Sequence, residues 1–213
     1  MSAGPGGAAP DPGRFLQAPA ARPVLRLVLA DPAGAAGGVL SAAMGPELAV
    51  EPLAGPLDGA EPWSVGAGRW PLLPWALLAV AGAGPGGATV LADAVRAVRA
   101  AGAAGRPPAG LLLCPSPDAA APPLEAGAEA DGPLPCPVVV LARDGDGSGP
   151  AAAGTGGVAA GTGGAADGAV AAWRRLAPEV FTVRLLGPAG WSDPAAAAET
   201  ARTVKEELHI WPA

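Results

Sequence analysis

Six short apolar runs, separated by polar or Gly/Pro-rich stretches, are the feature of this sequence that most constrains its fold. The runs are continuous rather than alternating in polarity, which is typical of strands buried on both faces of a sheet. They occupy residues 24–30, 48–53, 75–81, 110–114, 136–142 and 180–186. Helical patterns separate or follow some of them, at residues 87–102, 167–177 and 193–208. Alternating strands and helices predict an α/β fold with a mainly parallel sheet and helices on both faces.

Two regions depart from this alternation. Residues 58–71, where a further crossover helix would be expected, are rich in Pro and Gly and form a poor helix. Residues 144–168 contain the near-tandem repeat AAGTGGVAAGTGG and indicate a flexible insertion. The Pro/Gly-rich residues 1–22 predict a disordered tail, so we expect a single domain over residues 23–213. Ser192 or Asp193 is the expected N-cap of the last helix.

The charge and the apolar content exclude two classes of partner. The net charge of the 213-residue chain is −6, and the sequence offers no Lys/Arg cluster that would neutralise several phosphates, so nucleic acid is not expected as a partner. The longest apolar stretch, residues 71–83, contains 13 residues and two prolines. A helix needs about 20 residues to span a bilayer. The first residues also lack the basic start and apolar run of a signal peptide, so we expect a soluble cytoplasmic protein without a membrane partner.

The two cysteines, Cys114 and Cys136, are too few and too far apart for a metal knuckle or a redox CxxC pair. We expect both to be buried thiols at strand ends, and we expect neither a metal nor a cofactor. The only histidine, His209, ends the last helical pattern, where the helix macrodipole favours a cation.

A glycine-rich turn, VAGAGPGG at residues 80–87, connects the third apolar run to a helical pattern. As a phosphate loop it matches GxGxxG through Gly82, Gly84 and Gly87. However, no acidic residue ends the next strand about 20 residues on, and a dinucleotide fold carries this motif after its first strand. As a nucleophile elbow, G-x-S-x-G, the turn has both flanking glycines, but Gly84 stands at the serine position. The surrounding sequence is needed to decide between the two.

Four segments, in the correct order, resemble the type II thioesterases of polyketide and nonribosomal peptide biosynthesis. They resemble that family's first strand and oxyanion loop, its strand, elbow, helix and next strand, its acid loop, and its histidine loop with the terminal helix. The segments are residues 25–38, 74–117, 134–150 and 169–208, and Ala-Trp-Arg at 172–174 is the most specific piece. This family consists of α/β-hydrolases that cleave acyl groups from carrier-protein thioesters. The resemblance therefore implies an α/β-hydrolase-like fold.

The resemblance also assigns the catalytic positions, and two of the three catalytic side chains are missing. The nucleophile position falls on Gly84, which has no side chain. The acid position is retained at Asp146, with Asp144 beside it, whereas the base position falls on Gly190 or Trp191.

Other side chains are poor substitutes for the missing ones. About 15 helical residues at about 1.5 Å each carry His209 on the order of 20 Å from the site. A hydroxyl without a base is a weak nucleophile, and the hydroxyls that would lie near the site are Ser41, Thr89, Ser116 and Ser192. The family's helical lid is also truncated, because only the Pro/Ala/Gly-rich residues 115–135 connect the two strands that it would join.

These departures predict a degenerate thioesterase-like protein of polyketide or nonribosomal peptide biosynthesis, catalytically inactive and with a binding or accessory role. The partner that the resemblance implies is an acyl or peptidyl carrier protein or an assembly-line enzyme. Candidate contact residues are Trp63, Trp70, Trp75 and Trp191 and, for an acidic carrier, Arg96, Arg99, Arg174 and Arg175. Two alternatives remain open: an active acyl-thioester hydrolase with a displaced nucleophile, and a nucleotide-binding protein that uses the GxGxxG turn.

Overall fold

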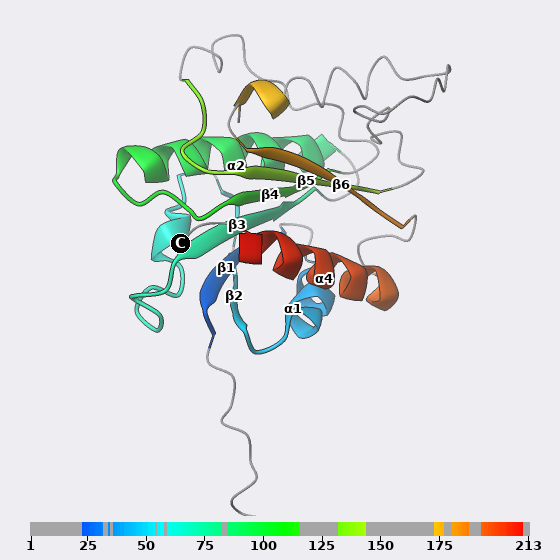
Figure 1. The fold of residues 1–213 in the computed structure, drawn as a ribbon. Helices are drawn as coiled ribbons and strands as arrows, with labels where there is room; N and C mark the ends of the chain where they lie inside the picture. Colours follow the sequence, from blue (N-terminus) through cyan, green and yellow to red (C-terminus); the bar gives the residue numbers. More distant parts are fainter. Residues whose placement is uncertain are drawn as a thin grey trace, which may run out of the picture.

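The computed structural model describes residues 23–31, 34, 36–53, 55–57, 59–81, 85–115, 132–143, 173–176, 180–187 and 193–210. Six strands in these residues form one sheet in the order β2-β1-β3-β4-β5-β6, and every neighbouring pair is parallel (Figure 1). They are β1 (Leu25–Ala30), β2 (Leu48–Pro52), β3 (Trp75–Val80), β4 (Leu111–Cys114), β5 (Val138–Arg143) and β6 (Phe181–Leu186). All six predicted strands are confirmed, with bounds that differ by at most two residues.

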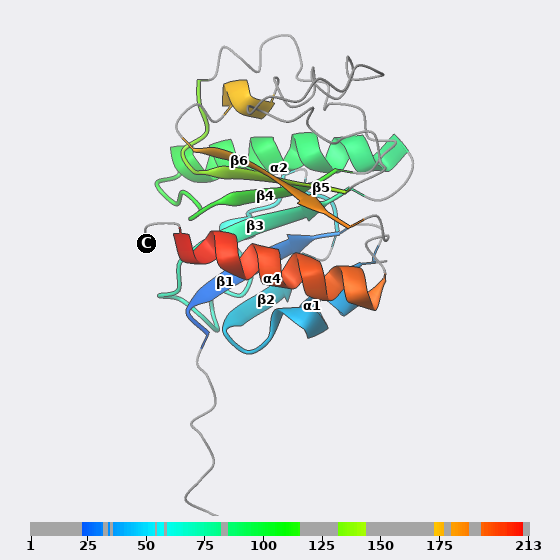
Figure 2. The same cartoon turned by 45° about the vertical axis from the view of Figure 1, so that its right-hand side comes forward.

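Helices cover both faces of the sheet, as predicted. The described helices are α1 (Gly37–Met44), α2 (Pro85–Ala103) and α4 (Pro194–Ile210), with a 3-10 turn η2 (Pro62–Ser64). Helix α2 lies on one face, and α1 and α4 lie together on the other (Figures 1 and 2). A short helical stretch at 173–176, part of the predicted helix at 167–177, packs on the α2 face through Trp173 and Leu176. These layers confirm the α/β fold class.

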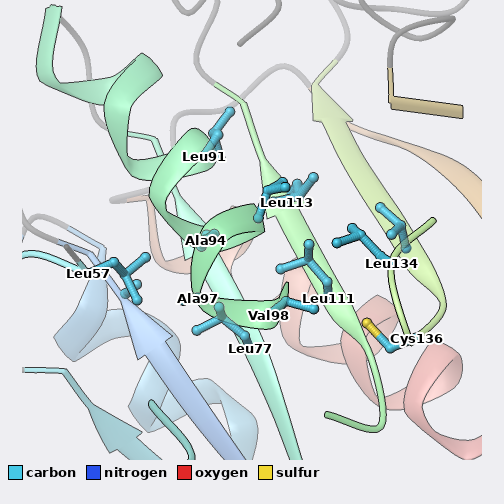
Figure 3. Close-up of a cluster of buried hydrophobic side chains, with 14 of the residues drawn as sticks. Leu57, Leu77, Leu91, Ala94, Ala97, Val98, Leu111, Leu113, Leu134 and Cys136 are labelled. Carbon is cyan, nitrogen blue, oxygen red and sulfur yellow. The ribbon is translucent and has the colours of Figure 1, made fainter. Parts of the chain in front are cut away.

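Two apolar clusters, one on each face, form the core. Strands β1, β3, β4 and β5 are buried along their whole length, which confirms the interpretation of their continuous apolar runs. Alternate side chains of β3 point to opposite faces, so Leu77 contributes to the α2 cluster and Leu78 to the α1/α4 cluster. Figure 3 shows Leu91 and Val98 of α2 facing β4, where Leu111 extends the same cluster.

Helix α1 was not expected from its sequence, because glycines at its first two positions disfavour a helix. A carboxylate from the preceding loop compensates for them. Asp31 Oδ2 accepts hydrogen bonds from the backbone N–H of Ala36 at 2.9 Å and of Gly37 at 2.7 Å. Two of the N-terminal amides that a helix leaves unpaired are thereby satisfied from outside the helix.

Of the two predicted N-cap residues of helix α4, Asp193 caps the helix. Its Oδ1 accepts hydrogen bonds from the backbone N–H of Ala195 at 2.7 Å and of Ala196 at 3.3 Å. The alternative cap, Ser192, lies outside the described residues.

Strand β6 differs from the prediction that all six strands are buried on both faces. Its residues are half-buried or exposed apart from Leu186, and 56% of Leu185 is exposed. Among the described strands it pairs with β5 alone, so it is an edge of the described sheet. The Arg184 guanidinium on this strand forms an ion pair with the buried carboxylate of Glu207 on α4.

The segment between β2 and β3 forms no α-helix, as its Pro/Gly content predicts. It contains η2 and a series of turns. Two charged strand residues hold it: Arg26 Nη2 donates to the carbonyl of Trp63 at 2.8 Å, and Glu51 Oε1 accepts from Trp70 Nε1 at 3.2 Å. Both side chains thereby attach the segment to the sheet.

Several predictions concern residues beyond the described ones. The tail at 1–22, the insertion at 144–168 and most of the lid link at 115–135 lie outside them and stay predictions. In the described part, no helix is long and apolar enough to cross a membrane, and no group of three or more His, Cys, Asp or Glu could hold a metal ion. Cys114 and Cys136 are free, buried thiols, as predicted; Cys114 ends β4, whereas Cys136 lies just before the start of β5.

Candidate functional site

The order of the strands marks the carboxyl ends of β1 and β3 as the candidate site. The chain runs from β1 outward to β2 and then returns to β3 on the other side of β1, so the order reverses between β1 and β3. In open α/β sheets, ligands bind at such a reversal, at the carboxyl ends of the strands. The thioesterase resemblance places the oxyanion loop in the segment after β1, within residues 31–38, and the nucleophile elbow in the segment after β3, at residues 82–86.

On the β1 side of this edge, the N-terminus of α1 already holds an anion. The Asp31 carboxylate accepts hydrogen bonds from the backbone N–H groups of Ala36 and Gly37. The N–H of Gly34 donates to the Asp31 carbonyl at 3.0 Å. Gly34 has φ of 67°, a conformation that favours glycine. A helix N-terminus is a ready anion site, and here two of its donors are bound to the chain's own carboxylate rather than open to a substrate oxyanion.

On the β3 side, a buried strand is followed after a short connection by a helix, the order of elements that an elbow requires. Strand β3 ends at Val80 and α2 begins at Pro85. Ala81 is fully buried, and its N–H donates to the Cys114 carbonyl at 2.9 Å, which fixes the start of the turn against β4. Gly84, the predicted nucleophile position, lies outside the described residues.

The predicted acid and base positions also lie outside the described residues. These are Asp146 with its neighbour Asp144, and Gly190 with Trp191. The strands that lead to them are described, since β5 ends at 143 and β6 ends at 186. Because β5 and β6 are parallel neighbours, the acid and base segments leave the sheet at the same edge.

A buried arginine connects the ends of these two strands. Arg143, the last residue of β5, is 4% exposed. Its Nη1 donates to the Gly187 carbonyl after β6 at 2.9 Å. Its Nη2 donates to Thr200 Oγ1 on α4 at 3.1 Å and approaches the Ala196 carbonyl at 3.5 Å. One guanidinium thus holds β5, the residue after β6 and α4 together.

Glu199 completes this arrangement from α4. Its Oε2 accepts a hydrogen bond from the Gly187 N–H at 3.0 Å. Both polar groups of the Gly187 backbone are therefore bound to charged side chains, and such charge-assisted hydrogen bonds are stronger than neutral ones. Sequence reasoning missed Arg143, Glu199 and Thr200. The available signal was an arginine at the end of an otherwise apolar strand.

The thiol of Cys114 lies at the carboxyl end of β4 and is therefore a candidate for a displaced nucleophile. Burial raises its pKa, and the nearby Arg143 guanidinium offsets only part of that rise. The side chain is fully buried. Since the thiolate is the nucleophilic form, burial and the raised pKa both disfavour a nucleophilic role for Cys114.

The remaining predicted residues are spread over the fold. Ser41 is half-buried on α1 and Thr89 is exposed on α2, while Ser116 lies outside the described residues. The ring Nδ1 of His209 lies 2.6 Å from the Lys205 carbonyl in the last turn of α4, in agreement with the predicted role at a helix C-terminus. It lies at the opposite end of α4 from the Gly187 network.

The tryptophans suggested as contact residues divide into two groups. Trp75 is buried and its Nε1 donates to the Arg106 carbonyl at 3.1 Å, so it is a core residue. Trp63 and Trp70 are half-buried in the segment between β2 and β3. Trp191 lies outside the described residues.

The parallel sheet in the order β2-β1-β3-β4-β5-β6, with helices on both faces, has the arrangement of an α/β-hydrolase-like fold. No family model and no curated protein matches the sequence. One solved structure, RedJ with a PEG molecule bound in its active site, aligns with 95% of this chain and 97% of its own chain, at 17% identity and a TM-score of 0.51. A second, RedJ thioesterase from the prodiginine biosynthetic pathway in Streptomyces coelicolor, gives 15% identity and a TM-score of 0.48, over 88% of this chain and 95% of its own.

At this identity the likeness to the first RedJ structure concerns the fold, and it extends over nearly the whole chain. The α/β-hydrolase-like fold that the thioesterase resemblance implies is therefore confirmed.

Proposed function

We propose that this chain is a thioesterase-like protein that does not hydrolyse acyl thioesters and has a binding or accessory role in polyketide or nonribosomal peptide biosynthesis. The observation that carries the proposal is Gly84, a residue without a side chain, in the segment of sequence that connects β3 to α2. RedJ, which shares the fold, is a thioesterase of prodiginine biosynthesis.

The chemistry of the surroundings supports the absence of hydrolysis. Members of a catalytic triad act as a unit, so the absence of both nucleophile and base removes nearly all covalent catalysis. The only histidine of the chain is His209, which caps the far end of α4. At the described carboxyl ends of β5 and β6, Arg143 and Glu199 make hydrogen bonds to the Gly187 backbone, and Arg143 also donates to Thr200 on α4, so these charged groups are engaged within the fold.

The donors near the β1 loop support the same conclusion. An oxyanion hole needs backbone amides that are free to bind developing negative charge. At the N-terminus of α1, the amides of Ala36 and Gly37 are bound by Asp31. The remaining role at this edge is non-covalent binding, and we propose an acyl or peptidyl carrier protein or an assembly-line enzyme as the partner.

Hydrolysis assays test the proposal directly. The purified full chain is offered an acyl thioester of a carrier protein, and a serine-reactive fluorophosphonate in a separate reaction. We expect no turnover above the uncatalysed rate and no labelling. Turnover, or labelling abolished by Ser41→Ala or Thr89→Ala, would instead favour a hydrolase with a displaced nucleophile. Calorimetric titration with NAD or ATP should give no heat, and saturable heat would favour the nucleotide-binding alternative.

A further inference from the structure

A groove between α1 and α4 lies on the face of the sheet opposite α2. The two helices lie side by side on this face (Figures 1 and 2). The groove has a volume of about 540 Å³ and is lined by Ala43, Ala198, Arg202, Lys205, Glu206 and His209. Ligand-binding clefts in proteins have volumes of about 300–1,000 Å³, so this groove is large enough for a pair of large side chains.

The polar groups of the groove are engaged with other groups of the fold. Arg202 Nη1 forms an ion pair with Glu206 Oε1 at 3.1 Å, and Lys205 Nζ forms one with Glu47 Oε2 at 3.4 Å. The ring Nδ1 of His209 lies 2.6 Å from the Lys205 carbonyl. Between these pairs, the groove presents the methyl groups of its two alanines and the aliphatic stems of its long side chains. Such a surface suits an apolar occupant.

The N-terminal tail brings an apolar pair close to this groove. In the tail, Phe15 and Leu16 are the only aromatic or branched aliphatic residues, and they lie outside the described residues. The N–H of Val24, at the start of the described chain, donates to the Glu47 carbonyl at 2.9 Å. The side chain of Glu47 is the one that pairs with Lys205 in the groove. The tail therefore joins the sheet beside the groove.

The reach of the tail is sufficient for this groove. Leu16 precedes Val24 by eight residues, and an extended chain of that length spans up to about 27 Å. The groove follows α4 from Ala198 to His209, a length of about 16 Å at about 1.5 Å per residue. A short tether also presents its side chains at an effective concentration in the millimolar range. A modest gain from apolar burial is then enough to keep them in the groove.

We propose that Phe15 and Leu16 dock in the groove between α1 and α4, which attaches the N-terminal tail to this face of the fold. The Pro/Gly content of the tail predicts disorder, and the docked pair fixes it at one point. The contact is separate from the proposed function, because the groove is formed by helix surfaces and not by the carboxyl ends of β1 and β3.

Limited proteolysis of the full chain tests this docking. Arg14 is the only residue of the tail after which trypsin cleaves, because Arg22 is followed by proline. A docked tail shields the bond after Arg14, so the cleavage rate reports the population of the undocked tail. Ala198→Glu places a charge in the groove and should speed this cleavage about fivefold, as followed by mass spectrometry. Ala100→Glu, at an exposed alanine of α2 on the other face, is the matched control and should be cleaved at the wild-type rate.

An introduced disulfide shows where the tail lies. The two native cysteines are buried, so oxidised glutathione acts on introduced thiols. Gln17→Cys combined with Ala198→Cys should form an intramolecular disulfide about tenfold faster than Gln17→Cys combined with Ala100→Cys. Addition of Phe15→Ser and Leu16→Ser should remove this difference.

The outcomes separate the tail from other occupants of the groove. Equal cleavage of the two glutamate variants, or equal disulfide rates for the two cysteine pairs, overturns the proposal. A disulfide between two chains rather than within one also overturns it, because a second copy would then occupy the groove. Ala198 and Ala100 are both exposed, so these substitutions leave the core intact. The thioester assay does not involve the tail, so the proposed function and the docking of the tail fail separately.

Discussion

Replacement of Arg143 by methionine tests whether the buried arginine orders the edge of the sheet that carries the candidate site. The methionine side chain retains most of the apolar contacts of the arginine stem but none of its donors. The Gly187 carbonyl and Thr200 Oγ1 then lose hydrogen bonds of 2.9 and 3.1 Å from a charged group.

The magnitude follows from these two bonds. A hydrogen bond to a charged group contributes about 1.5–3 kcal/mol. The contact with the Ala196 carbonyl, at 3.5 Å, adds little. We therefore expect the free energy of unfolding to fall by about 3–6 kcal/mol, which corresponds to a decrease in Tm of about 10–20 °C for a chain of this size.

Urea unfolding of Arg143→Met and of Arg202→Met provides the assay, with the second variant as a matched control. Arg202 and Glu206 form an exposed ion pair at 3.1 Å, and its loss should cost no more than about 0.5 kcal/mol. Hydrogen exchange at the Gly187 amide gives a local readout. This amide donates to Glu199 and should exchange faster in Arg143→Met than in the wild type. Equal destabilisation of the two variants, with unchanged exchange at Gly187, would refute the role assigned to Arg143.

Three further predictions concern the cap of α1, the elbow and the buried thiols. Asp31→Ala should destabilise the fold by about 1–2 kcal/mol in urea unfolding, since two amides of α1 lose their acceptor, whereas Asp31→Asn should cost less. Gly84→Ser should leave thioester turnover at background, because a serine without a base stays a weak nucleophile; activity from this single change would contradict the proposed loss of the base. Burial raises the pKa of Cys136 to about 12, so its thiol stays protonated in the folded chain above pH 8.5, where the unfolded thiol ionises. Stability should then fall as the pH rises from about 8.5, by up to about 1.4 kcal/mol per pH unit, and Cys136→Ala should reduce that slope.

The sequence predicts those parts of the fold that depend on local patterns. The continuous apolar runs give β1, β3, β4 and β5, because a strand buried on both faces leaves no polar positions. The caps and glycine content explain α4 and the absence of a crossover helix between β2 and β3. Helix α1 could not be found in this way, since its N-terminus is stabilised by Asp31, a residue outside the helix.

The candidate site is less predictable for a related reason. The location of the site, at the carboxyl ends of β1 and β3, follows from the strand order. The alternation of strands and helices in the sequence indicates a parallel sheet but does not give that order. The network of Arg143 joins residues that are 44 to 57 positions apart in the chain, and no local pattern indicates such contacts. The catalytic positions at Gly84, Asp146 and Trp191 come from the thioesterase resemblance and stay predictions.

The ion pair between Arg184 and Glu207 has a consequence for how copies of this chain meet one another. An edge strand offers unpaired backbone groups, and an edge made of Phe, Thr, Val and Leu would be an efficient template for strand addition. In the described part of the sheet, β6 is such an edge, and Arg184 is its one charged residue. Charged side chains on an edge strand disfavour the addition of a further strand, and the ion pair with the buried Glu207 carboxylate holds this charge on β6. A single contact that anchors α4 to the sheet thus also fixes a charge on an edge strand that otherwise carries none.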